Sequence, residues 1–174
     1  MPIFCQTENP GAVETISVGI GHLAIATAPT QLRSLLGSCV GLVLHDRVAR
    51  LGGLAHVVLP ASRGEIEMPG KFADTAVSAL LAEMDRCLGR PCRGRVVAKL
   101  VGGACMFSIS GGQNSHPGLN VGQQNHQALE RILASLQIPI VAREVGGTTG
   151  RRLTLDTATG LVTIKIPGGQ DHEI

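Results

Sequence analysis

Short apolar runs, broken by glycines and polar turns, occupy most of the chain and predict a strand-rich domain. The apolar, β-branched runs at residues 40–44 and 51–59 flank residues 46–49, and this order predicts a hairpin. A second hairpin is expected to close the chain across residues 158–160. The expected strands, six to eight in number, cover residues 16–20, 22–27, 40–44, 51–59, 95–101, 138–145, 151–156 and 161–166.

Two further segments repeat their apolar residues every three or four positions, which is the period of a helix with one buried face. The first helix is expected at residues 71–88 and ends before Gly89 and Pro91. The second is expected at residues 121–136, with Asn120 as its N-cap. Strands together with two amphipathic helices predict a layered α/β fold with much antiparallel pairing.

The composition is that of one globular domain. The chain has 174 residues, 44% of them hydrophobic and 16% charged, which is enough apolar material for a single core. The net charge of +2 argues against nucleic acid as the main partner, and the absence of Tyr and Trp argues against a stacking surface for bases or sugars.

The chain divides into a flexible arm at residues 1–13, a single domain at 14–167 and a tail at 168–174. The first residues have the pattern of neither a secretory signal nor a membrane span. The longest nearly apolar run, residues 35–44, is about half the length that a membrane-spanning helix needs. Five irregularly spaced cysteines suggest reduced thiols. We therefore expect a cytoplasmic protein.

Cys39 and His56 stand on opposite sides of the first expected hairpin. If His45 pairs with Arg50 across the turn, opposing residue numbers sum to 95, and Cys39 then lies opposite His56. Directly opposed residues have Cβ atoms about 4.5–5.5 Å apart. Because the thiolate is the nucleophile and a histidine takes up its proton, this register predicts a nucleophile and its base. A β-bulge would change the register.

The residues before Cys39 suit cleavage of an amide. Gly37 leaves room for a substrate, and the backbone N–H groups of Ser38 and Cys39 are expected to stabilise an oxyanion. On residue types alone, the commoner case is a structural one: Cys39 as a small buried residue and His56 as a hydrogen-bonded core histidine.

Six motifs in unbroken order resemble the CheD family of chemoreceptor glutamine deamidases, over roughly residues 14–166. The first is Leu36-Gly37-Ser38-Cys39-Val40, with His56 seventeen residues after the cysteine. The other five lie at residues 53–60, at 69–76, at 102–107, at 120–122 with Asn125, and at Gly146-Gly147 with Arg151.

The resemblance implies an α/β sandwich of the α-β-β-α type, related to the deamidase domains of some bacterial toxins. It implies hydrolysis of selected glutamine side chains of methyl-accepting chemoreceptors to glutamate, with release of ammonia. By matching position, Cys39 is the nucleophile and His56 the base. The chemistry requires no metal or cofactor. A CheC-type phosphatase is a second partner in some members of the family.

Members of the family can carry a threonine a few residues before the cysteine as a third catalytic residue. Here Arg33 or Ser34 occupies that position, depending on the register. Ser34 keeps a hydroxyl group that would orient His56. If Arg33 holds the position, the third residue is lost or is replaced by another group.

Other residues of the motifs are candidates for the substrate pocket. Gly102 and Gly103 end a strand, and the second glycine pair leads to Arg151 and Arg152, either of which would suit acidic residues on a receptor helix. Ordinary tight loops with solvated arginines explain these residues equally well. Asn120 is a further candidate, although a helix cap explains it fully.

Three other functions remain open or are set aside. A metal site at Cys87, Cys92, His116 and His126 lacks a second tight pair of ligands, so we expect no metal. A non-catalytic regulatory partner of receptors or of a phosphatase remains possible because the third catalytic position is altered. A cysteine peptidase or general amidase would need a downstream Asn or Asp, for which Asn120 or Asn125 would have to serve.

Overall fold

The computed structural model describes residues 13–64, 67–105 and 120–174, which form two sheets of five strands each. The first sheet has the strand order β1-β3-β8-β9-β10. Its members are β1 (Thr15–Ser17), β3 (Gln31–Leu36), β8 (Arg151–Asp156), β9 (Val162–Lys165) and β10 (His172–Glu173). The second sheet has the order β2-β5-β4-β6-β7. Its members are β2 (Leu23–Thr27), β5 (Leu51–Val57), β4 (Val40–Asp46), β6 (Val96–Gly102) and β7 (Ile140–Val145).

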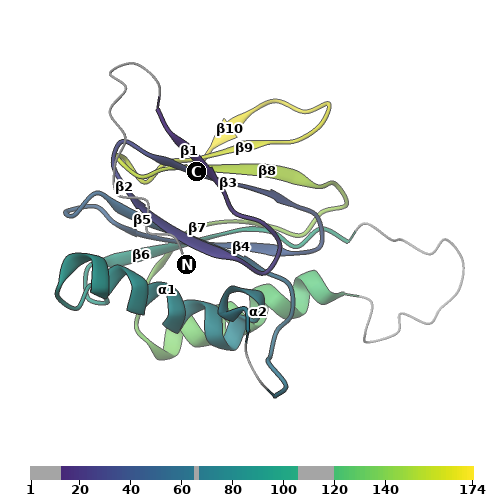
Figure 1. Ribbon diagram of the computed structural model, residues 1–174. Helices are drawn as coiled ribbons and strands as arrows, with labels where there is room; N and C mark the ends of the chain where they lie inside the picture. The colour runs from purple at the N-terminus through teal and green to yellow at the C-terminus, as the bar shows by residue number, and fades with distance from the viewer. Residues whose placement is uncertain (1–12, 65–66, 106–119) are drawn as a thin grey trace, which may run out of the picture.

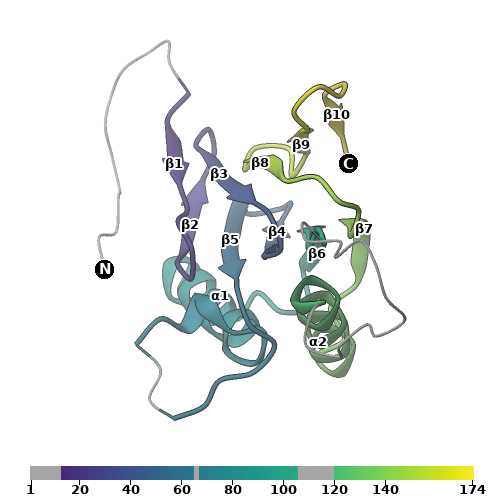
Figure 2. The same ribbon diagram turned by 90° about the vertical axis from the view of Figure 1, so that its right-hand side faces the viewer.

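Three layers build the domain (Figures 1 and 2). The first sheet lies on the second, and the helices α1 (Ala73–Leu88) and α2 (Val121–Ser135) lie side by side on the other face of the second sheet. Neighbouring strands are antiparallel except in the pairs β1–β3 and β6–β7. The predicted layered α/β sandwich with two main helices is therefore confirmed. Within the described ranges no helix covers the outer face of the first sheet, so the helical layer lies on one side only.

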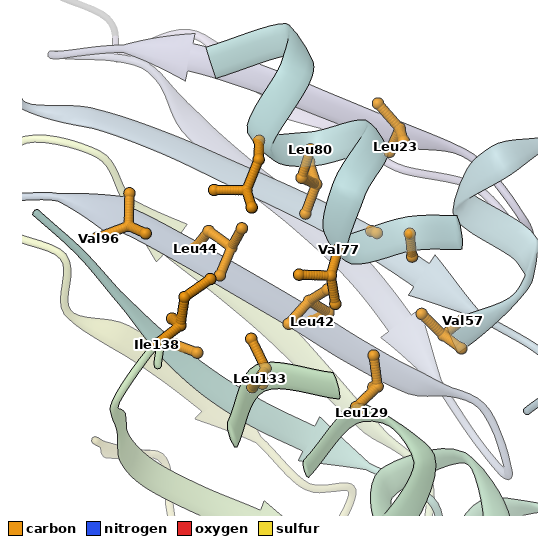
Figure 3. Packing of buried hydrophobic residues seen from close by; sticks show 14 of the residues in the cluster. Leu23, Leu42, Leu44, Val57, Val77, Leu80, Val96, Leu129, Leu133 and Ile138 are labelled. Atoms are coloured by element: carbon orange, nitrogen blue, oxygen red, sulfur yellow. The ribbon is translucent and has the colours of Figure 1, made fainter. Parts of the chain in front are cut away.

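The larger core lies between the helices and the second sheet (Figure 3). Leu42 and Leu44 of β4 pack there with Leu80 of α1 and Leu129 of α2. A second core fills the space between the two sheets, where Val43 of β4 joins the inward leucines of the first sheet. Because both faces of β4 and β5 are covered, every residue of these strands is buried. This burial explains why their sequences are continuously apolar instead of alternating.

Both helices begin and end within two residues of the prediction. The first begins later than expected because Pro69–Lys71 forms a short 3-10 helix, η1, and it ends at Gly89, whose φ is 64°. The predicted cap of α2 is confirmed: Asn120 accepts a hydrogen bond from the Gln123 N–H at 3.0 Å. None of the described helices is long and apolar enough to cross a membrane.

The register of the first hairpin differs from the prediction by two residues. Asp46 pairs with Leu51, so opposing numbers sum to 97 instead of 95, and His56 lies opposite Gly41. The turn consists of residues 47–50 because the Asp46 side chain accepts the N–H groups of Val48 and Ala49, at 3.1 and 3.0 Å. The predicted direct pairing of Cys39 with His56 is wrong.

Two segments carry structure that the sequence pattern did not predict. Residues 31–36 form β3, which was not among the expected strands. Within residues 168–174, expected as a tail, β10 pairs with β9 and extends the first sheet. Residues 1–12 of the expected arm and His116 lie outside the described residues.

Candidate functional site

His56 lies on the face of β5 that is turned toward the first sheet. Its side chain is 3% exposed. The ring atom Nδ1 lies 2.8 Å from Oγ of Ser34, on β3 of the other sheet. The same hydroxyl donates a hydrogen bond to the Val18 carbonyl at 2.7 Å. A continuous hydrogen-bonded chain therefore links His56 to the backbone across the inter-sheet core.

This chain determines which nitrogen of the neutral His56 ring carries the proton. A serine hydroxyl has one hydrogen to donate, and Ser34 donates it to Val18. The 2.8 Å contact with His56 is then a hydrogen bond only if Nδ1 carries the hydrogen and Ser34 Oγ accepts it. The lone pair of the neutral ring is therefore on Nε2, the nitrogen that points away from Ser34, which leaves Nε2 able to act as a base.

Cys39 lies in the bend where the chain crosses from the first sheet to the second. It is half-buried and packs against the apolar cluster between the sheets. Cys39 directly precedes β4 and packs on the inter-sheet side, the side on which His56 contacts Ser34.

The backbone carbonyls on either side of Ser38 are held by the residues that follow β6. The N–H of Gly103 donates to the Cys39 carbonyl at 2.7 Å, and the N–H of Ala104 donates to the Gly37 carbonyl at 2.9 Å. The N–H groups of Ser38 and Cys39 have no acceptor among the described residues. Within the described residues the bend therefore has held carbonyls and two backbone donors without an acceptor.

Gly102 has to be glycine for this bend to form. Its φ is 106°, and an added Cβ would lie 2.5 Å from the Cys39 carbonyl oxygen. Gly41 is less strictly constrained: a Cβ there would lie 2.9 Å from Leu36 Cδ1, the end of a side chain that can move. The sequence analysis missed Gly41; a glycine inside an otherwise apolar strand was the signal that indicated a close approach. No sequence signal pointed to the Val18 carbonyl.

Two hollows adjoin the bend. One, of about 650 Å³, is bounded by residues 35–37, 148–152 and 165–167. The other, of about 210 Å³, lies between the glycine pairs at 103 and 146–147 and the start of α2, where Asn120 and His126 contribute to its wall. Gly37, Gly103 and Asn120, which were expected near the substrate, therefore do line hollows in this region.

Arg151 differs from the exposed arginine expected in a loop. It is 7% exposed, and its guanidinium donates to the Glu144 carbonyl at 2.8 Å and to the Gly146 carbonyl. A longer contact, 3.4 Å, joins it to the Glu144 carboxylate. These bonds make Arg151 a brace for the loop between β7 and β8, while its neighbour Arg152 is exposed.

Burial acts on both members of the thiol–imidazole pair. It raises the pKa of the Cys39 thiol above its ordinary value. It lowers the pKa of His56, an effect that the Val18 carbonyl only partly offsets. Both shifts favour the uncharged forms, so near neutral pH the free protein holds a protonated thiol and a neutral imidazole.

The comparisons with known proteins agree on one family. A sequence model of the family described as CheD chemotactic sensory transduction matches residues 58–166. A protein of Symbiobacterium thermophilum, named as a probable chemoreceptor glutamine deamidase CheD, is 43% identical over 91% of this chain and 96% of its own. One from Desulforamulus reducens with the same name is 44% identical over 88% of this chain and 91% of its own. The chain belongs to the CheD family.

Among solved structures, the hypothetical protein YfiH of Bacillus licheniformis is a distant match, with 15% identity and a TM-score of 0.45 over 73% of this chain and 51% of that one.

The two residues considered for the third position, Arg33 and Ser34, face opposite sides of the first sheet. Ser34 faces inward and contacts His56, whereas Arg33 faces the outer side of the first sheet, as the alternation of β3 requires. The family model matches residues 58–166, so Ser34, Cys39 and His56 all lie before the matched range. The match therefore says nothing about these three residues.

Within the described ranges no three His, Cys, Asp or Glu side chains converge as metal ligands would. Cys87 is exposed at the end of α1, while Cys92 is buried.

We predict that the Cys39 thiol is alkylated slowly at neutral pH. Because burial raises its pKa, the rate with iodoacetamide rises with pH to a midpoint above the ordinary range of cysteine thiols. Peptide mass spectrometry across a pH series measures the rate at Cys39, with Cys39→Ala as the blank. A plateau already reached at pH 7 would instead indicate a thiolate–imidazolium pair in the free protein.

We predict that Gly102→Ala impairs both stability and activity, because the new Cβ strains a positive φ and displaces the Cys39 carbonyl. The expected loss of unfolding free energy is about 1–3 kcal/mol. The matched control is Gly89→Ala, where φ is also positive, 64°, but nothing lies within 4 Å of the added Cβ. It should lose stability and keep activity. Equal activity loss in both variants would contradict the proposed close contact.

Proposed function

We propose that this chain hydrolyses selected glutamine side chains of chemoreceptors to glutamate, with Cys39 as the nucleophile. Relatives that share 43–44% of its residues over most of its length carry the name of chemoreceptor glutamine deamidase, which supports an amidohydrolase. The observation that supports the cysteine mechanism is the Val18–Ser34–His56 chain, because it leaves an unprotonated Nε2 on the face shared with Cys39.

In the first step of the proposed reaction, Cys39 Sγ attacks the side-chain carboxamide carbon of the glutamine. The thiol proton passes to His56 Nε2 as the C–S bond forms, because the resting thiol is neutral. The carboxamide oxygen becomes an oxyanion, which the backbone N–H groups of Ser38 and Cys39 would stabilise.

The tetrahedral adduct then collapses to a thioester. His56 returns its proton to the nitrogen, the C–N bond breaks, and ammonia leaves. Neutral His56 next removes a proton from water, and the resulting hydroxide attacks the thioester carbonyl. The C–S bond breaks, the thiolate regains the proton, and glutamate is released. The sum is one water consumed and one ammonia formed for each glutamine.

Modification of a chemoreceptor's signalling region would place this chain in the cytoplasm. A CheC-type phosphatase as a second partner rests on family resemblance alone.

We predict that Cys39→Ala abolishes deamidation, with a fall of at least about 10³-fold, because no other group can form the thioester. The assay incubates each variant with a chemoreceptor cytoplasmic fragment and follows the mass gain of about one dalton that accompanies Gln→Glu. Cys87→Ala, which removes an exposed thiol on α1, is the matched control and should retain full activity. Activity that survives in Cys39→Ala would exclude this mechanism.

We predict that Ser34→Ala lowers kcat about tenfold to a hundredfold and leaves KM nearly unchanged. The loss of one hydrogen bond with a buried partner left unsatisfied costs about 1–3 kcal/mol. Without the hydroxyl, His56 is no longer restricted to one tautomer, so the pH profile of kcat should also change. Ser34→Thr keeps the hydroxyl and should restore both values. A loss of thermal stability with no change in kcat or its pH profile would make Ser34 merely structural.

A further inference from the structure

The outer face of the first sheet is the one sheet face that no described element covers (Figures 1 and 2). The alternation of β3, β8 and β9 turns their apolar residues inward. Their outward residues are Gln31, Arg33, Leu35, Arg152, Thr154, Asp156, Thr163 and Lys165. This face therefore combines three cations and one carboxylate with one large apolar side chain, Leu35, which is 67% exposed.

A hollow of about 650 Å³ begins at Leu35. Ile166 and Pro167 provide apolar wall on the opposite side, and Arg152 and Lys165 stand at its margin. Isolated exposed leucines are common on proteins, but an exposed leucine within a hollow of this size matches the anchor position of a protein-recognition site.

Of the outward charges on this sheet, the cations Arg152 and Lys165 line the hollow, whereas the carboxylates Asp156 and Glu173 do not. Arg152 lies directly opposite Lys165 and diagonally beside Arg33, so three cations are close neighbours. Lys165 pairs with Asp171, but neither Arg33 nor Arg152 has a carboxylate partner in the part of the chain that is described. The buried Nε of Arg33 also lacks an acceptor there. Like charges placed opposite each other destabilise a sheet, and two unpaired guanidinium groups suit carboxylates.

The hollow is continuous with the bend that carries Cys39. Gly37 lines it and is two residues before the thiol. Gly150, on the other wall, approaches so closely that an added Cβ would lie 3.1 Å from the Leu36 carbonyl. An occupant of the hollow therefore touches the same backbone segment that holds the candidate nucleophile.

The occupant has to present side chains. The backbone N–H and C=O groups of β3, β8 and β9 are hydrogen-bonded to one another, so a peptide strand cannot add to the sheet on this face. A helix with an apolar residue and carboxylates on one side meets the requirements of this face.

We propose that the outer face of the first sheet is the docking surface for the substrate protein, and that it recognises an acidic amphipathic helix. An apolar side chain of that helix enters the hollow at Leu35, and its carboxylates bind Arg33 and Arg152. The helix is held with a target glutamine near the Cys39 bend. This inference rests on the proposed deamidase function.

The test is charge reversal with a matched control. Arg33→Glu/Arg152→Glu should raise KM for a chemoreceptor cytoplasmic fragment about 10- to 100-fold, and Arg152→Glu alone should have a smaller effect. Arg47→Glu/Arg131→Glu makes the same change in net charge at the exposed β4–β5 turn and on α2, and should leave KM unchanged. The rate of Cys39 alkylation should stay the same in all variants, which shows that the site is intact. Replacing acidic residues of the substrate helix by lysine should restore KM in the double variant.

Binding separates this inference from the proposed function. Cys39→Ala should bind a fluorescent fragment with an affinity that falls with added salt and with the double reversal. Binding of this kind without any deamidation by the wild type would refute the proposed reaction and support the docking surface. Deamidation with an unchanged KM in the double reversal would refute the docking surface alone. The docking surface would also be refuted if the double reversal left binding of the fragment unchanged. The same holds if it altered only sedimentation with anionic vesicles or only self-association.

Discussion

Strands β4 and β5 are covered on both faces, and this double burial is the constraint on which the rest of the molecule depends. A polar side chain on such a strand has little access to water, so its buried polar atoms need partners from the protein. His56 is on one of these strands, with 3% of its side chain exposed. Ser34 on the facing sheet supplies that partner, and the Val18 carbonyl takes up the remaining hydrogen. The requirement to satisfy a buried histidine thus also determines which nitrogen is free.

The sequence predicted the elements of the second sheet better than their register. The apolar runs of β4 and β5 are strong signals because both faces are buried, and the hairpin between them is present as predicted. Its register differs by two residues because Asp46 remains in the strand and bonds the N–H groups of the turn with its own carboxylate. Asp46 is part of the strand, but its side chain bonds the turn. The order of residue types along the chain does not show which of the two roles sets the register.

The omission of β3 has a related cause. Its inward residues are Leu32, Ser34 and Leu36, so a polar residue interrupts the apolar side of the alternation. The serine is inward because it serves His56, 22 residues away in sequence and in the other sheet. Val18 comes from the segment just after β1, a third strand. No spacing along the chain encodes the meeting of three segments from two sheets. The contact between Ser34 and His56 was therefore expected only from the family resemblance, and the role of the Val18 carbonyl was not expected at all.

Because Cys39 and His56 are both uncharged in the free protein, reaction at the site depends on how the substrate is bound. A thiolate is the form that small electrophiles and oxidants attack, and burial of Cys39 keeps its thiol protonated. Burial also keeps the neighbouring His56 neutral, so the base is available, although its lowered pKa makes it a weak proton acceptor. In the proposed mechanism the proton then moves only when a carboxamide carbon is held against the sulfur and an oxyanion forms beside the free N–H groups of the bend. Selectivity among glutamines therefore depends on surfaces that position a protein substrate, because the reactive groups alone do not supply a preformed nucleophile.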